Sequence, residues 1–164
     1  YPCYVMVDSN DIVWFAEFAG NKIGRLNPYT NEIAEWVIPT SNSLPSGLYV
    51  TMGLVYFAEY NSKKMGRLNP STNEMTQWSL SWHEGGQPYG TFVDSTGDVW
   101  FVVHGPINWL FRLSADNIFT YWSFPDGRVG TYGLTIDTKM NFGDIYVSTG
   151  SPWGAILRFR SATP

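Results

Sequence analysis

The chain has 164 residues, of which 44% are hydrophobic and 17% aromatic, enough for one globular domain with a sizeable core. Its formal net charge is −4, and its 10 Lys and Arg residues form no basic stripe, which argues against nucleic acid as a partner. No apolar run reaches membrane-spanning length, so we expect no membrane insertion.

Short aromatic and β-branched runs, separated by Gly, Pro, Asn and Asp, predict β-strands in the first half of the chain. In residues 1–40 these runs are Tyr4–Val7, Val13–Glu17, Gly24–Leu26 and Ile33–Trp36. In residues 41–82 the corresponding runs are Pro45–Leu48, Val55–Glu59, Gly66–Leu68 and Met75–Trp78. The segment Gly24–Pro28 returns unchanged as Gly66–Pro70, so the second set repeats the first.

The same order continues in the second half with looser copies. Residues 83–126 carry Pro88–Thr91, Val99–Val103, Phe111–Ser114 and Phe119–Trp122. Residues 127–164 carry Thr131–Leu134, Ile145–Ser148 and Leu157–Arg160, with no fourth run. The chain therefore repeats one unit of about 42 to 46 residues roughly four times.

Turn residues stand between the predicted strands. Asp8–Asp11 and Asp94–Asp98 are typical of tight hairpin connections, as are Asn27–Asn31 and Asn69–Asn73. Each unit is therefore predicted to be a four-stranded antiparallel meander, and no helical period is present.

A single meander of this kind has two apolar faces, and packing sheet on sheet around an axis covers both. We therefore predict an all-β β-propeller, or part of one, as a single domain over 1–164 with blades near 1–40, 41–82, 83–126 and 127–164. A stacked β-solenoid or an open array of sheets is the alternative. The count of about fifteen strands leaves the last blade without its outer strand. Either four blades close imperfectly, or missing sequence or another chain completes the ring, so we expect self-association.

The repeat resembles the blades of the streptogramin B lyase (virginiamycin B lyase) family. The resemblance is carried by Lys22–Leu26 and Lys64–Leu68 and by the Trp/Tyr-Phe-Ala-Glu runs ending at Glu17 and Glu59. It implies a propeller with seven blades in known members, one of which uses Mg²⁺ to open a cyclic depsipeptide by elimination. Blades of this pattern also occur in proteins with no demonstrated lyase activity.

The resemblance also implies where the chemistry of active members lies. They carry His between Pro and Gly of the innermost strand in two blades, one of them after Glu-Pro, and a further Glu just past the Trp-Phe strand. Here the corresponding positions hold Cys3, Ser46, Tyr89 and Tyr132. Gln87-Pro88-Tyr89 stands where Glu-Pro-His would be, and His104 lies near the place of the later Glu. Gln cannot act as a base, and a tyrosine with a pKa near 10 is normally protonated. We therefore assign no catalytic residue.

The remaining polar residues give a weaker indication of a binding site. His83-Glu84 begins like a zinc-protease motif, but Gln87 stands where the second His is required, so we predict no metal site. Cys3, the only cysteine, excludes an internal disulfide. The hypothesis is a ligand-binding site on one propeller face formed by the residues Tyr89, His104, Tyr132, Gln87 and His83. The repeated Glu17, Glu59, Arg25 and Arg67 are assigned a structural role, in strand-end ion pairs or hydrogen bonds to neighbouring blades.

Three functions are compatible with these features. The first is a non-catalytic propeller module for binding or assembly, outside the cytoplasm or on the cell surface, with no cofactor. The second is a lyase-like enzyme that needs further blades and Mg²⁺. The third is a binder of a carbohydrate or small ligand in the central funnel. The chain opens on Tyr1 rather than Met, which is compatible with a processed product or a fragment.

Overall fold

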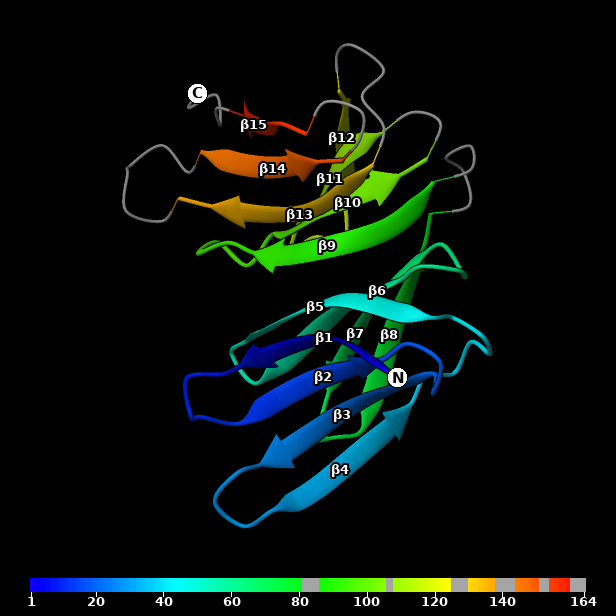
Figure 1. The fold of residues 1–164 in the computed structure, drawn as a ribbon, viewed down its shortest axis with the longest axis vertical. Coiled ribbons are helices and arrows are strands. Elements are labelled where there is room, and N and C mark those ends of the chain that lie inside the picture. Colours follow the sequence, from blue (N-terminus) through cyan, green and yellow to red (C-terminus); the bar gives the residue numbers. More distant parts are fainter. Residues whose placement is uncertain (81–85, 106–107, 125–129, 138–143, 151–153, 160–164) are drawn as a thin grey trace. The chain divides into compact units, whose positions relative to one another are not determined.

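The structure is a computed structural model that describes residues 1–80, 86–105, 108–124, 130–137, 144–150 and 154–159. All regular elements in these ranges are β-strands, arranged as three four-stranded sheets and one three-stranded sheet. Every strand pairs with its sequence neighbour (Figure 1), which confirms the predicted meanders. The chain divides into two compact units, Tyr1–Pro88 and Tyr89–Pro164.

The first unit contains two complete meanders. The first sheet consists of β1 (Pro2–Val7), β2 (Val13–Glu17), β3 (Lys22–Asn27) and β4 (Glu32–Val37). The second sheet consists of β5 (Pro45–Thr51), β6 (Leu54–Glu59), β7 (Lys64–Asn69) and β8 (Glu74–Ser79).

The second unit contains the other two meanders, its first strand beginning just before the unit does. The third sheet consists of β9 (Gln87–Val93), β10 (Val99–His104), β11 (Trp109–Leu113) and β12 (Phe119–Ser123). The fourth sheet consists of β13 (Thr131–Ile136), β14 (Ile145–Thr149) and β15 (Ile156–Phe159).

Aspartates fix the first hairpin of two sheets. Asp8 Oδ1 accepts hydrogen bonds from the backbone N–H groups of Asn10 and Ile12, and its Oδ2 accepts one from Trp14 Nε1 at 2.9 Å. Asp94 makes the same bonds in the third sheet, including 2.7 Å to Trp100 Nε1. One carboxylate thus closes the turn and also orients the first tryptophan of the following strand.

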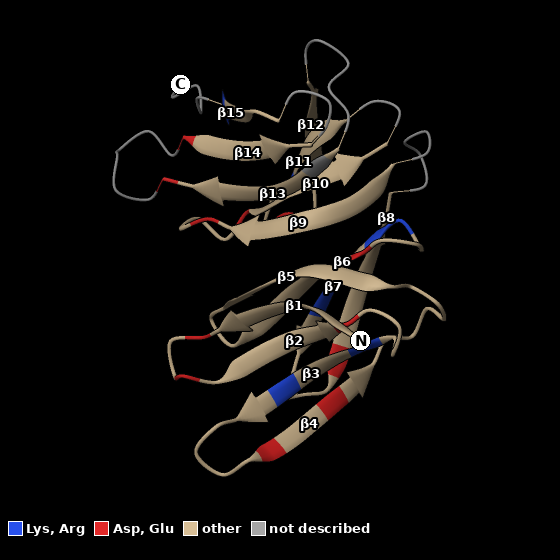
Figure 2. Ribbon diagram, viewed as in Figure 1, with Lys and Arg blue, Asp and Glu red and all other residues tan. Residues whose placement is uncertain are grey.

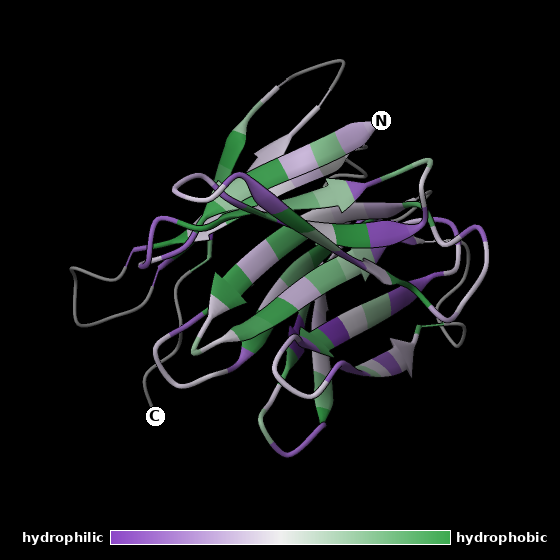
Figure 3. Cartoon of the chain, turned by 90° about the horizontal axis from the view of Figure 1, so that it is seen from below, coloured by the Kyte–Doolittle hydropathy of each residue, from purple (hydrophilic) through white to green (hydrophobic). Residues whose placement is uncertain are grey.

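Alternation of side chains builds the core of each unit. Hydrophobic and hydrophilic residues alternate along the strands (Figure 3), so that one set on each strand faces a neighbouring sheet. In the first unit, Trp14, Ala16 and Ile23 of the first sheet join Leu48 and Phe57 of the second in one buried cluster. In the second unit, Val102 and Leu110 pack in a cluster with Ile145 and Val147.

A glycine recurs at the same place in β3 and β7, and side-chain packing explains it. Gly24 lies directly opposite Phe15, and Gly66 directly opposite Phe57. A Cβ at either glycine would come within 2.1 to 2.2 Å of the opposite ring. The aromatic ring therefore occupies the space over the glycine, which is why Gly accompanies the Trp/Tyr-Phe run in the sequence.

Charged residues are sparse on the strands and mixed in sign (Figure 2). On the first sheet, β3 carries Lys22 and Arg25, and β4 carries Glu32 and Glu35. Within the described ranges, no helix is both long and apolar enough to cross a membrane.

Candidate functional site

Three of the five predicted site residues come together in the second unit. Tyr89 lies on β9, His104 ends β10 and Tyr132 lies on β13. The rings of Tyr89 and Tyr132 meet edge to face with centroids 5.6 Å apart, and the rings of His104 and Tyr132 do so at 5.5 Å. Tyr132 is therefore the central member of this cluster, and 49% of it is exposed.

Glycines hold the Tyr132 ring in place. A Cβ at Gly150 would lie 2.8 Å from Tyr132 Cε2, and one at Gly130 would lie 3.2 Å from the same atom. Gly150 also donates its backbone N–H to the carbonyl oxygen of Gly130. At Gly90, a Cβ would lie 2.8 Å from the Tyr132 carbonyl oxygen, so β9 and β13 approach closely at this point. The sequence did not identify Gly90, Gly130 and Gly150 as site residues. Gly90 was within reach of such a prediction, because Gly90 and Gly133 recur in the first run of the third and fourth repeat units.

His104 provides the imidazole of the cluster. Its Nδ1 is buried and has no hydrogen-bond partner among the residues that the structure describes. A buried ring nitrogen without a partner is costly, and a polar atom of a bound molecule or a water would remove that cost. His104 is therefore the polar contact that this aromatic cluster can offer.

Of the other two predicted site residues, the structure describes one. Gln87 begins β9, and its side chain is half-buried. His83 lies outside the described residues.

The side chains at the inner-strand positions where the resemblance would place histidines differ in type, burial and contacts. Cys3 is exposed, whereas Ser46 is fully buried and its hydroxyl donates to the carbonyl oxygen of Pro88 at 3.4 Å. Tyr89 and Tyr132 contact each other as rings.

The cluster does not fit Mg²⁺. This ion prefers carboxylate and water oxygens in octahedral geometry, whereas Tyr89, His104 and Tyr132 offer two phenol hydroxyls and an imidazole but no carboxylate. Over the described part of the chain, no group of three or more His, Cys, Asp or Glu is placed to hold a metal ion. The faces of the rings suit stacking against an apolar or planar ligand instead.

The repeated glutamates form a polar network inside the first unit. Glu59 is fully buried, and its carboxylate accepts hydrogen bonds from Gln77 Nε2 at 2.6 Å and from Ser62 Oγ at 2.7 Å. Burial raises the pKa of Glu59, and these two hydrogen bonds partly oppose that rise. Gln77 also donates to Thr40 Oγ1 at 3.0 Å, in the connection between the two sheets.

The first sheet has a less complete version of this network. Gly20 stands where Ser62 does, and Glu35 stands where Gln77 does. Burial, followed by the neighbouring Glu35, raises the pKa of Glu17. Glu17 Oε1 is buried and has no hydrogen-bond partner among the described residues.

The repeated arginines pack on tryptophans of their own sheets. The Arg25 guanidinium lies 5.9 Å from the Trp14 ring and 6.0 Å from the Trp36 ring, and Arg67 lies 5.5 Å from Trp78. These are cation–π contacts within one sheet. Arg67 Nη2 also donates a hydrogen bond to Thr76 Oγ1 of the same sheet at 3.3 Å.

Comparison with known proteins gives a consistent family. The model of the virginiamycin B lyase family matches residues 1–153. A streptogramin B lyase structure superposes with a TM-score of 0.80 at 21% identity, covering 96% of this chain and 54% of that one. The virginiamycin B lyase of Staphylococcus aureus superposes with a TM-score of 0.77 at 24% identity, covering 98% and 55%.

A third similar structure is the extracellular domain of a two-component system protein from B. thetaiotaomicron. It superposes with a TM-score of 0.68 at 15% identity, covering 98% of this chain and 20% of that one. The chain thus spans about half the length of the two lyases, and no curated protein sequence matches it. These similarities confirm the predicted fold class, β-propeller blades.

Proposed function

The chain belongs to the virginiamycin B lyase family, and within this family we propose that it is a non-catalytic binding module built from propeller blades. The observation that carries this proposal is the ring cluster of Tyr89, His104 and Tyr132. Its two tyrosines lie on the inner strands β9 and β13, at positions where the resemblance would place the histidines of an active lyase. A half-exposed tyrosine packed beside glycines offers a ring face for stacking, and aromatic residues bind with little loss of conformational entropy.

The ligand class that suits this cluster has an apolar or planar ring face and one polar atom. The ring would stack on the exposed part of Tyr132, and the polar atom would pair with His104. A glycan or an aromatic small molecule meets this requirement. The carboxylates that would bind a strongly cationic ligand are not part of the cluster.

A streptogramin B depsipeptide serves as the test probe, because it separates binding from lyase chemistry. Isothermal titration calorimetry with and without Mg²⁺ measures binding, and a panel of oligosaccharides is titrated in the same way. Elimination leaves the mass of the depsipeptide unchanged, so ring opening is followed by chromatography and fragment-ion mass spectrometry. Ring opening above background in the presence of Mg²⁺ would favour the lyase alternative and refute the proposal.

Substitution of the central ring gives the matching mutational test. For whichever probe binds, Tyr132→Ala is expected to raise the dissociation constant about tenfold, since stacking on one ring is worth about 1 kcal/mol or more. Tyr29→Ala is the control, because Tyr29 is 72% exposed on a turn of the first sheet. Equal effects of the two substitutions, or binding of no probe at all, would count against this site.

We further propose that the module lies outside the cytoplasm. Two features support this location: only 15% of residues are charged, and one structurally similar protein is an extracellular domain. Fractionation of producing cells with a specific antibody tests it. Recovery of the protein in the cytosolic fraction would be the contrary result.

A further inference from the structure

In the third and fourth sheets, the repeated arginine of the third strand is paired with a carboxylate. Arg112 donates its Nε–H to Asp98 Oδ2 at 2.6 Å, and Arg158 donates its Nε–H to Asp144 Oδ2 at 2.7 Å. Asp98 is 6% exposed and Asp144 is 2% exposed. Because each aspartate directly precedes the second strand of its sheet, the chain supplies a carboxylate to this arginine from the same place twice.

Arg25, the equivalent arginine of the first sheet, lacks such a carboxylate. Ile12 stands directly before β2, at the place where the other two sheets have their aspartate. Ala34 lies directly opposite Arg25 on β4. In the second sheet, Thr76 lies at that place and accepts a hydrogen bond from Arg67 Nη2 at 3.3 Å. The first sheet therefore provides Arg25 with neither of the acceptors that the equivalent arginines use.

The guanidinium of Arg25 lies against two tryptophan rings instead. Its Cζ is 5.9 Å from the centroid of the Trp14 ring and 6.0 Å from that of Trp36, and the two rings stack at 5.8 Å. Arg25 is half-buried, and no hydrogen bond or ion pair joins it to another residue in the described part of the chain. Its Nε is buried without an acceptor there. A buried donor without an acceptor is costly, and a charge-assisted hydrogen bond to an anion removes that cost.

This guanidinium lies at the seam between the first and second sheets, on the side of the first sheet that the second sheet covers. Trp14 belongs to the buried cluster between the two sheets, and Trp36 Nε1 donates to Asn73 Oδ1 of the second sheet at 2.7 Å. Both sheets lie within residues 1–80, which are described without a gap. Asp8 interacts with Arg25 electrostatically, but its carboxylate accepts its hydrogen bonds from its own turn and from Trp14.

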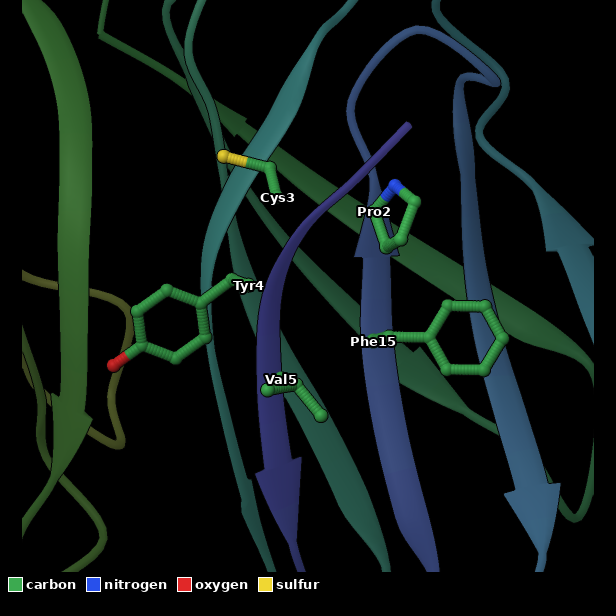
Figure 4. A pocket seen from close by; sticks show the side chains of 5 residues that line it. All are labelled: Pro2, Cys3, Tyr4, Val5 and Phe15. Atoms are coloured by element: carbon green, nitrogen blue, oxygen red, sulfur yellow. The ribbon is translucent and has the colours of Figure 1, made fainter.

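The other side of the first sheet has no equivalent cation. It carries a pocket of about 400 Å³ (Figure 4), lined by Pro2, Cys3, Tyr4, Val5 and Phe15. Phe15 follows Trp14 on β2, and successive side chains of a strand point to opposite faces, so the pocket and the guanidinium lie on opposite sides of the sheet. Since none of the five lining side chains is charged, the pocket provides no counter-ion for an anion.

We propose that Arg25 binds the carboxylate of an organic anion at the seam between the first and second sheets. The chain itself shows this preference, because Arg112 and Arg158 bind carboxylates at the equivalent position. A phosphate dianion would need a second cation, and the Lys22 ammonium of the same sheet is already paired with Glu35 at 2.6 Å. One guanidinium thus matches one carboxylate.

The rest of the ligand is a planar or apolar group. It would lie along the ring of Trp36, which is half-buried and therefore partly accessible. The ligand class is a monocarboxylate that carries such a group. This site lies in the first unit and is independent of the ring cluster of Tyr89, His104 and Tyr132.

Sodium benzoate is the probe, and its neutral analogue benzamide is the matched control ligand. Titrations are followed by NMR through the indole N–H resonances of Trp14 and Trp36, which both donate hydrogen bonds to described acceptors. Benzoate is expected to shift these resonances saturably, with a dissociation constant on the order of 1 mM. Benzamide and inorganic phosphate should each bind at least about tenfold more weakly.

Two variants test the role of the guanidinium. Arg25→Met removes the cation and should raise the dissociation constant for benzoate at least about tenfold. Ile12→Asp leaves Arg25 in place but supplies, from within the chain, the carboxylate that the third and fourth sheets have, so it should weaken binding by a similar factor. Arg67→Met is the control and should leave the affinity unchanged, and circular dichroism confirms that each variant is folded.

Any of four results would overturn the proposal. The first is a shift that does not saturate with benzoate up to about 100 mM, well above the expected dissociation constant. The second is a folded Arg25→Met or Ile12→Asp variant that binds benzoate as the native chain does. The third is binding of benzamide as tight as that of benzoate, and the fourth is tighter binding of phosphate than of benzoate.

Discussion

The glycine beneath each aromatic ring of the repeat permits a sharp comparison between two blades. Gly66→Ala would place a Cβ 2.2 Å from Cζ of Phe57, a side chain that is 0% exposed and enclosed on all sides. The ring cannot move away without disturbing the core, and such overpacking costs about 1–3 kcal/mol. The lower backbone entropy of Ala returns about 0.5–1 kcal/mol of this. We therefore expect Gly66→Ala to lower the free energy of unfolding by about 1–2 kcal/mol.

Gly24→Ala is the matched variant in the first sheet. The clash is nominally as close, 2.1 Å from Cε2 of Phe15. However, Phe15 is only half-buried, so its ring can turn toward solvent. We expect a cost below about 1 kcal/mol, because side-chain relaxation offsets most of the clash.

Both variants are compared with the native chain by urea denaturation and by thermal unfolding. For a chain of this length, about 1 kcal/mol corresponds to roughly 2–4 °C in melting temperature. The reasoning fails if Gly24→Ala is as destabilising as Gly66→Ala. It also fails if both substitutions are neutral, since the rings would then have room that the structure does not show.

Two further predictions concern the charged groups. Because burial raises the pKa of Glu59 above its ordinary value of 4.5, its contribution to stability is complete below that value and is lost as the pH rises through the folded-state pKa. The free energy of unfolding of Glu59→Gln should thus fall less than that of the native chain between pH 4 and pH 8, and parallel curves would contradict this. Arg112→Met leaves the carboxylate of Asp98, which is 6% exposed and accepts from Arg112 Nε at 2.6 Å, without its cation. We expect Arg112→Met to lower the free energy of unfolding, measured by urea denaturation, by about 1–2 kcal/mol, a cost that the partial exposure of the arginine limits. Arg67→Met is the control and should cost less, because Arg67 has no carboxylate partner in the contacts described. Equal losses for the two variants would refute this reasoning.

The strands and turns were predictable because their causes are local. Alternation of apolar and polar residues needs only a few consecutive positions, and Asp8 and Asn31 act within their own turns. The repeat adds a second constraint, since each unit must fold in the same way as the others. The structural role of the repeated glutamates could also be inferred, because their recurrence in successive blades argues against a single active site.

The candidate site could be predicted only in part. Equivalent positions in the repeat suggested Tyr89 and Tyr132, but neither residue reveals its partner in the sequence. Gly130 and Gly150, which hold the Tyr132 ring, are not in the repeated element and gave no signal.

The sequence by itself thus determined the unit of this protein, a four-stranded meander with a fixed pattern of inward and outward side chains. It also showed that the inner-strand positions at which the resemblance would place the histidines of an active lyase hold other residues here. Tertiary structure alone decided how deeply two equivalent positions are buried: Phe57 is 0% exposed in the cluster between the first and second sheets, whereas Phe15 is half-buried among the described residues. The physical reason is that burial belongs to a pair of surfaces, and one strand's sequence specifies only its own half of that pair.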